Sequence, residues 1–174
     1  MNRQPLIDQI PALRRYARAL TGDAWAADDL VQDTLERACA KWRLWLAGSD
    51  LRAWLFTLMH NLYVSQVRHR LRQGELAQAQ DLAELAQEPA APACGTDSAI
   101  DLQRCLLRLP EEQRVVLLLV TLEDLSYAEV ARITGVPVGT VMSRLSRARS
   151  RLQELMAASA VVAGSVAPPL RRLK

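Results

Sequence analysis

The chain has 174 residues, half of them hydrophobic, which is enough for one domain or for two small ones with buried cores. Its 22 basic and 19 acidic residues give a mildly basic net charge of +3, and its three widely spaced cysteines, with no CxxC pattern, argue against a metal site or a disulfide framework. Neither a signal peptide nor a bilayer-spanning run is recognisable, so we expect a soluble, cytoplasmic protein. We also expect it to bind no cofactor and no metal.

Helical periodicity recurs along the chain without sustained period-two alternation, so the sequence predicts an all-α fold. A first helix is expected from Leu6, interrupted near Pro11 and ended by Thr21 and Gly22. Asp23 can cap the next helix.

The second predicted helix covers about residues 24–42, with apolar residues on its inner side. Its outer side carries a polar and acidic row: Asp29, Gln32, Asp33 and Glu36. The helix dipole favours acids in the early turns, so this row is typical of a solvated face. The alternative is a docking surface for a basic partner.

A third helix is predicted over about residues 51–72, with Ser49 as its cap. Its inner side has Leu51, Trp54, Leu55, Leu58 and Leu62, whereas Thr57, His60, Asn61, Ser65 and Arg68 lie on or near the other side. It ends in a basic cluster of Arg68, His69, Arg70 and Arg72. Neither histidine has a recognisable catalytic or metal-ligand partner.

Residues 73–98 contain five acidic residues and no lysine or arginine, and Pro89, Pro92 and Gly95 mark a break. A weak helix over residues 76–87 is compatible with this composition, but the segment is typical of an acidic linker. The basic residues therefore lie in the two flanking parts, a distribution typical of nucleic-acid binders with an acidic connector.

Residues 125–155 have the pattern of a helix-turn-helix, preceded by a helix that Ser98 can cap and another that begins at Pro110. Ser126 and Glu129 form a capping box, and Gly135 stands where the turn needs a positive φ. Pro137 suits the first turn of the second helix.

The second helix of this motif has apolar residues at helical spacing on one side: Val141, Leu145, Ala148, Leu152 and Leu155. The other side has Thr140, Ser143, Arg144, Arg147 and Arg151. Short polar groups followed by arginines suit base edges and phosphates, although an arginine stripe is more often only a solvated face. Because cap, turn and stripe coincide, the pattern favours DNA binding.

Residues 157–174 are expected to be a frayed tail.

From Leu13 to Leu155 the chain resembles a bacterial sigma factor of the extracytoplasmic-function (ECF) group. The resemblance rests on four motifs in order: DDLVQDTLERA at 28–38, LRAWLFTLMHNL at 51–62, RLPEEQRVVLLL at 108–119 and GTVMSRLSRAR at 139–149. It implies two small helical domains, sigma region 2 in residues 1–72 and sigma region 4 in residues 99–156. Residues 73–98 would join them along the polymerase RNA-exit path.

The resemblance also implies partners and site residues. Core RNA polymerase would dock on Asp29, Gln32, Asp33 and Glu36. The promoter −10 element would be recognised and melted by His60, Asn61, Ser65, Arg68 and Arg70, and the −35 element read by Thr140, Ser143, Arg144, Arg147 and Arg151. An anti-sigma factor is a further expected partner, and no small-molecule substrate is expected.

Some positions depart from the family pattern. Asp33 stands where Glu is more common, His60 and Ser65 replace residues that are more often Arg and Asp, and Met142 occupies a place often held by Lys. These departures bear on which promoter sequences are read.

Two other classes of protein remain as alternatives. A free-standing dimeric helix-turn-helix regulator would need an effector or dimerisation domain in the first half. An enzyme of nucleic-acid metabolism would need a metal cluster, a phosphate-binding glycine loop or a nucleophile–base pair, and the sequence has none at recognisable spacing.

Overall fold

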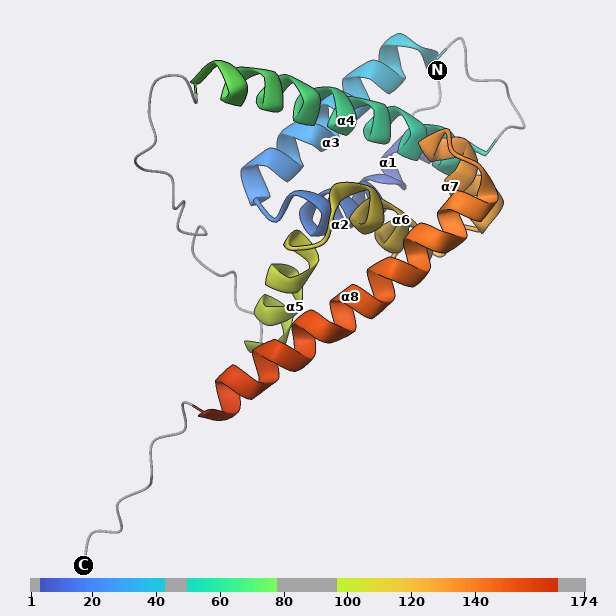
Figure 1. The fold of residues 1–174 in the computed structure, drawn as a ribbon. Helices are drawn as coiled ribbons and strands as arrows, with labels where there is room; N and C mark the ends of the chain where they lie inside the picture. The colour runs from blue at the N-terminus through green and yellow to red at the C-terminus, as the bar shows by residue number, and fades with distance from the viewer. Residues whose placement is uncertain (1–3, 43–49, 78–96, 166–174) are drawn as a thin grey trace, which may run out of the picture.

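The computed structural model describes residues 4–42, 50–77 and 97–165, and all of its regular secondary structure in these ranges is helical (Figure 1). The helices are α1 (Gln4–Ile7), α2 (Ile10–Thr21), α3 (Ala24–Ala40), α4 (Leu51–Ala77), α5 (Asp97–Leu107), α6 (Glu111–Thr121), α7 (Tyr127–Thr134) and α8 (Val138–Ser165). The predicted all-α fold is therefore confirmed over these residues. None of the described helices is long and apolar enough to cross a membrane.

The first half is a bundle in which α3 packs on both α2 and α4. Its core residues follow helical spacing on each helix and include the aromatic side chains of Tyr16, Phe56 and Tyr63. The Tyr16 ring from α2 meets the Phe56 ring from α4 edge to face, with centroids 5.3 Å apart. Both side chains are almost wholly buried.

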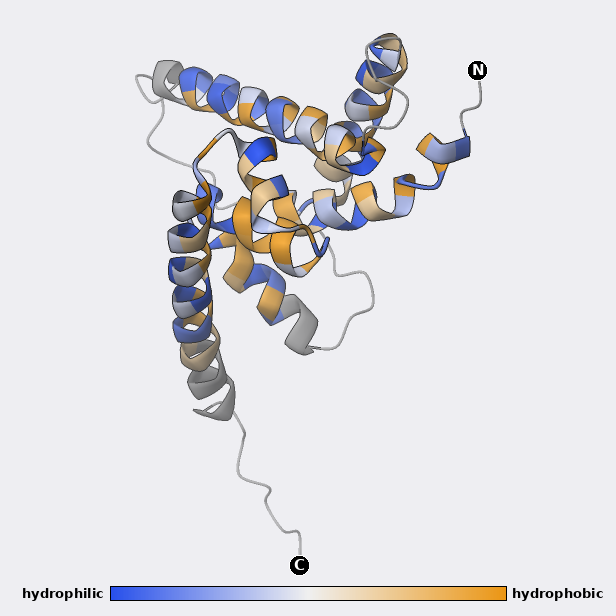
Figure 2. Cartoon of the chain, turned by 90° about the vertical axis from the view of Figure 1, so that its right-hand side faces the viewer, coloured by the Kyte–Doolittle hydropathy of each residue, from blue (hydrophilic) through white to orange (hydrophobic). Residues whose placement is uncertain are grey.

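The second half is built around α6, which contacts both α7 and α8. Five consecutive α6 residues, 115–119, are buried, so this helix is covered on every side along that stretch. Figure 2 shows this as a hydrophobic centre, whereas the outer surface of α8 carries hydrophilic residues. Val141, Leu145, Ala148 and Leu155 are buried as predicted, and Leu152 is half-buried against the same core.

The predicted local signals at two helix starts and one turn are confirmed. The Asp23 carboxylate accepts a hydrogen bond from the Ala26 backbone N–H at 2.7 Å. Ser126 and Glu129 form the reciprocal capping box before α7. Gly135 has φ 69°, the left-handed conformation that ends α7 and begins the turn to α8.

Several predicted boundaries are wrong. The cap of α4 is Asp50, whose carboxylate accepts from the backbone N–H groups of Arg52 and Ala53; the predicted cap, Ser49, lies outside the described residues. Helix α4 also runs to Ala77 rather than 72, and α5 begins at Asp97, one residue before Ser98. The weak helix expected over residues 76–87 lies mostly outside the described ranges.

The expected frayed tail is wrong for residues 157–165, because α8 continues to Ser165. This stretch is rich in alanine, the best helix former, and contains no proline. Residues 166–174 lie outside the described ranges.

The two halves lie against each other. Helix α2 contacts α5 and α6, and α4 contacts α7. These contacts place the first-half and second-half surfaces predicted for DNA binding within one molecule of closely packed helices (Figure 1).

Candidate polymerase and nucleic-acid interfaces

The outer face of α3 is an exposed acidic surface. Asp29, Gln32, Asp33 and Glu36 are all exposed, while Ala27, Leu30, Val31, Thr34 and Ala38 are buried on the inner side. The Gln32 amide donates to the Glu36 carboxylate at 3.0 Å, and the Gln66 amide from α4 donates to Asp33 at 3.2 Å. These contacts leave the carboxylates accessible to a partner.

Trp25 lies one turn before Asp29 on the same helix and is 83% exposed. Trp is rarely left so accessible, and an aromatic of this size beside acids is typical of a protein interface. Helical spacing did not predict this exposure, because most tryptophans in small domains are core residues. Trp54, in contrast, packs against the core as predicted, and Trp42 also packs against it.

Helix α4 carries the residues expected to act at the −10 element. Asn61, Ser65, Arg68 and Arg70 are exposed, so their polar groups are free to meet a ligand from solvent. His60 differs, because its side chain is half-buried and its Nδ1 atom is buried without a hydrogen-bond partner among the described residues. The structure therefore presents four of these five side chains on an open surface.

Helix α8 presents the residues expected to read the −35 element. Ser143, Arg147 and Arg151 are exposed, and Thr140 is half-buried near the start of the helix. The Arg144 side chain is only 21% exposed and forms an ion pair with Glu112 of α6. Arg144, the central arginine of the predicted DNA-reading face, is therefore paired with the Glu112 carboxylate in this structure.

The positive charge of Arg144 acts on His60 across the boundary between the halves. Burial and, second, the positive charge of Arg144 lower the pKa of His60 below its ordinary value of 6.5. A residue expected at the −10 element and one expected at the −35 element are thus close enough to interact electrostatically.

We expect His60 to titrate below pH 6.5 in the free protein. Because the unfolded chain takes up this proton at a higher pH than the folded chain, the folded state loses stability as the pH falls below about 6.5. NMR titration of the ring protons, assigned with a His69→Gln variant, measures the pKa. Arg144→Ala should raise it while leaving it below 6.5, since burial is the larger cause. A midpoint at or above 6.5 in the unmodified protein would contradict the buried placement.

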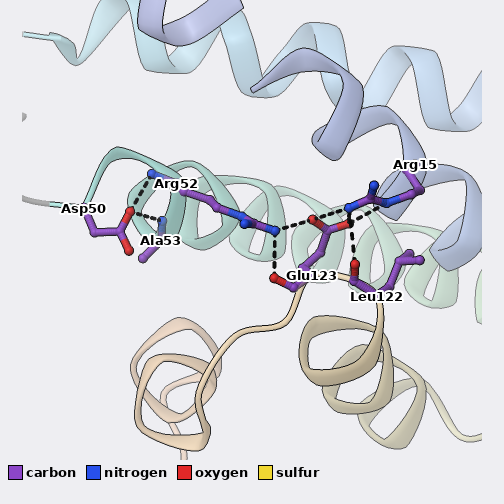
Figure 3. Close-up of polar contacts among 6 residues, drawn as sticks. All are labelled: Arg15, Asp50, Arg52, Ala53, Leu122 and Glu123. Atoms are coloured by element: carbon purple, nitrogen blue, oxygen red, sulfur yellow. Dashed lines mark hydrogen bonds and ion pairs between the residues drawn. The ribbon is translucent and has the colours of Figure 1, made fainter. Parts of the chain in front are cut away.

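Sequence reasoning missed a cluster around Glu123, which follows α6 (Figure 3). The Glu123 side chain is completely buried, and its carboxylate meets the guanidinium groups of Arg15 from α2 and Arg52 from α4. The N–O distances are 3.0 Å to Arg15 Nη2 and 2.7 Å to Arg52 Nη2. No local pattern marks this acid, because its partners lie 108 and 71 residues away.

The fold and these surfaces define a helical DNA-binding protein with a helix-turn-helix and a separate exposed acidic face on α3. Family models for the "Sigma2 domain of PhyR" and for "Sigma-70, region 4" match residues 6–60 and 99–152. Together they cover most of the described chain, with one model in each half.

Curated relatives match along both halves. The ECF RNA polymerase sigma factor EcfG of Rhodopseudomonas palustris is 40% identical over 154 residues, covering 88% of this chain and 84% of EcfG. The ECF sigma factor SigM of Mycobacterium tuberculosis is 35% identical over 144 residues, covering 83% of this chain and 71% of SigM.

A similar solved structure is that of the sigma factor RpoE in complex with the anti-sigma factor NepR from Bartonella quintana. It superposes with a TM-score of 0.75 at 39% identity, covering 89% of this chain and 96% of RpoE. The chain belongs to the ECF group of sigma-70-family RNA polymerase sigma factors. The similarity extends through the first half, where a free-standing helix-turn-helix regulator would have a different domain. The alternative of such a regulator is therefore not favoured.

Proposed function

We propose that this protein directs core RNA polymerase to a set of promoters by using three surfaces. The acidic face of α3 docks on core polymerase, α8 reads the −35 element, and α4 recognises and opens the −10 element. The protein acts as a non-enzymatic subunit in the cytoplasm, where bacterial polymerase and chromosome lie. The observation that carries this proposal is the placement of an acidic exposed face and a polar, basic exposed helix in the half that lacks the helix-turn-helix.

Each surface has the chemistry that its partner requires. The carboxylates of Asp29 and Asp33 suit a basic surface on polymerase, and exposed arginines on α8 suit phosphates and guanine edges. On α4, Asn61 and Ser65 offer hydrogen-bond donors and acceptors to an unstacked base, with Arg68 and Arg70 behind them for the backbone. Binding the single strand supplies free energy for opening the duplex.

An anti-sigma factor is the expected regulator. The similar RpoE structure holds the anti-sigma factor NepR, and the cytosolic domain of CnrY is bound to CnrH in another structural neighbour that is 26% identical to this chain. A partner of this kind would control access of the sigma factor to polymerase.

In vitro transcription with core polymerase on a genomic library tests the proposed function. Transcripts that depend on the protein and start downstream of a shared pair of elements are the expected result. If core polymerase gives the same transcripts with and without the protein, the proposal is wrong.

Asn61→Ala should slow promoter opening about 10-fold on duplex templates and have little effect on a template with a pre-melted bubble. The reason is that a hydrogen bond to the base, worth up to about 1.5 kcal/mol, matters while the base must be captured from the duplex. Stopped-flow fluorescence of a labelled −10 region measures the rate. Gln73→Ala removes an exposed amide on another face of α4 and serves as the control. Equal slowing on both templates would rule out a melting role for Asn61.

A further inference from the structure

The Glu123 carboxylate joins three segments from both halves of the molecule. The Arg15 guanidinium donates to both carboxylate oxygens and to the Leu122 carbonyl, with N–O distances of 3.0 to 3.2 Å. Arg52 Nη2 donates at 2.7 Å both to the Glu123 carboxylate and to the Glu123 backbone carbonyl. Figure 3 shows the carboxylate between the two guanidinium groups. A single side chain from the second half therefore ties α2 to α4.

The backbone after α6 turns so that this side chain faces the first half. Asp124 has φ 52°, a left-handed conformation that Asp adopts more readily than most residues. The backbone N–H of Glu123 donates to the Leu118 carbonyl at 3.3 Å, and that of Leu125 donates to the Leu119 carbonyl at 3.1 Å. The turn is thus hydrogen-bonded to the end of α6 on both sides of Asp124. These two hydrogen bonds fix the orientation of the Glu123 side chain toward the first half.

Other contacts between the halves accompany the carboxylate. The Gln103 amide from α5 donates to the Ala19 carbonyl at 3.2 Å, near the end of α2. The Arg114 guanidinium from α6 donates to the Tyr63 hydroxyl of α4 at 3.0 Å. Leu107 lies against Gly22, where an added Cβ would come within 2.5 Å of a Leu107 methyl group. These contacts follow one boundary and define the closed arrangement, in which α2 and α4 pack on α5, α6 and α7.

The closed arrangement cannot place both DNA-reading helices on one promoter. The −35 and −10 elements are about 25 base pairs apart, or roughly 85 Å along B-form DNA at 3.4 Å per base pair. A compact chain of 174 residues has a radius of gyration of about 16 Å and a diameter of roughly 40 Å. Helix α4 contacts α7, and α7 packs on α8, so the two reading surfaces lie near each other. The halves must separate before both elements are bound.

We propose that Glu123, with Arg15 and Arg52, is a latch that holds the free protein in this closed, promoter-incompetent arrangement. The proposal rests on the proposed division of promoter recognition between α4 and α8. Opening the latch exposes Arg15 and Arg52 fully and allows α8 to move away from α4. The fraction of molecules that are open then sets the apparent affinity of the protein for its transcription partners.

Glu123 is the member of the latch whose removal is most informative. Its side chain is fully buried, while those of Arg15 and Arg52 are 54% and 37% exposed. Glu123→Ala therefore leaves two arginines that water can solvate, whereas removing the arginines would leave a buried carboxylate without its partners. Glu123→Gln keeps the shape of the side chain and removes only its charge.

Small-angle X-ray scattering of the full-length protein, without DNA or polymerase, tests whether Glu123 holds the halves together. We expect the radius of gyration to increase in the order unmodified protein, Glu123→Gln, Glu123→Ala, with unchanged helical content by circular dichroism. Glu112→Ala removes an acid from the ion pair with Arg144 within the second half, and its radius should stay unchanged. An unchanged radius in both Glu123 variants overturns the latch, as does an increase that occurs only with loss of helix.

Transcription with core polymerase then tests whether the latch is inhibitory. The concentration of Glu123→Ala that gives half-maximal transcription should be lower than that of the unmodified protein by about threefold or more. A variant that opens without this gain would overturn the inhibitory role while leaving the latch in place. If the unmodified protein fails to direct transcription, the proposed function is refuted instead. The scattering result does not depend on the proposed function, so the two failures can be distinguished.

Discussion

Replacing Asp29, Gln32 and Asp33 together by alanine should weaken binding to core RNA polymerase by more than about 100-fold and abolish protein-dependent transcription. The three side chains share the exposed face of α3, at positions i, i+3 and i+4. Removing two charges and an amide from one interface eliminates several charge-assisted hydrogen bonds, and each is worth about 1.5–3 kcal/mol. Fluorescence anisotropy of labelled protein titrated with core polymerase measures the affinity.

The fold should survive this triple substitution, because the inner side of α3 is untouched and its buried residues keep their packing. Within the protein, the substitution removes two exposed hydrogen bonds, from Gln32 to Glu36 and from Gln66 to Asp33. A matched control is Gln4→Ala with Asp8→Ala, which removes an amide and an acid from the start of the chain. Unchanged polymerase affinity in the triple variant, with helical content preserved, would refute α3 as the docking face.

Arg144→Ala should weaken protection of the −35 element in the polymerase–promoter complex by about 10-fold or more, with little change in core polymerase binding. One bidentate contact from arginine to a guanine accounts for about 1–3 kcal/mol of discrimination. Arg144 lies in the second turn of α8, where it is half-buried beside Glu112. Footprinting on a promoter identified by transcription measures the loss of protection.

The loss of the ion pair with Glu112 should not complicate the interpretation of the Arg144→Ala footprint. Glu112 is mostly exposed, so water solvates its carboxylate when the arginine is removed, and the cost to folding is small. Arg104→Ala is the matched control, because Arg104 is an exposed arginine of α5 paired with Asp101. A footprint that is the same in both variants would show that Arg144 does not read the −35 element.

Local signals in the sequence predicted much of the fold. The Asp23 cap, the Ser126–Glu129 box and the left-handed Gly135 all act through residues three or four positions apart, so a short window contains the whole interaction. The apolar spacing of α8 predicted its buried face for the same reason. Boundaries were less predictable, because α4 and α8 continue past weak stop signals.

The face of α4 was harder to predict. Phe56, Met59 and Tyr63 are buried in addition to Leu55 and Leu58, which lie on the predicted inner side. One side of α4 packs on α3 and another lies against the second half, so more than a single stripe is covered. A one-face periodicity cannot show this, since the second cover comes from residues far along the chain.

The sequence by itself determined the class of the protein and the composition of its surfaces: an acidic row on α3, a polar and basic α4, and an arginine stripe on α8. Only the tertiary structure decided which of these groups are accessible. It half-buries His60, holds Arg144 against Glu112 and encloses Glu123 between Arg15 and Arg52. The physical reason is that burial and charge pairing depend on contacts between residues far apart in sequence. Helical periodicity records only the neighbours within a few turns.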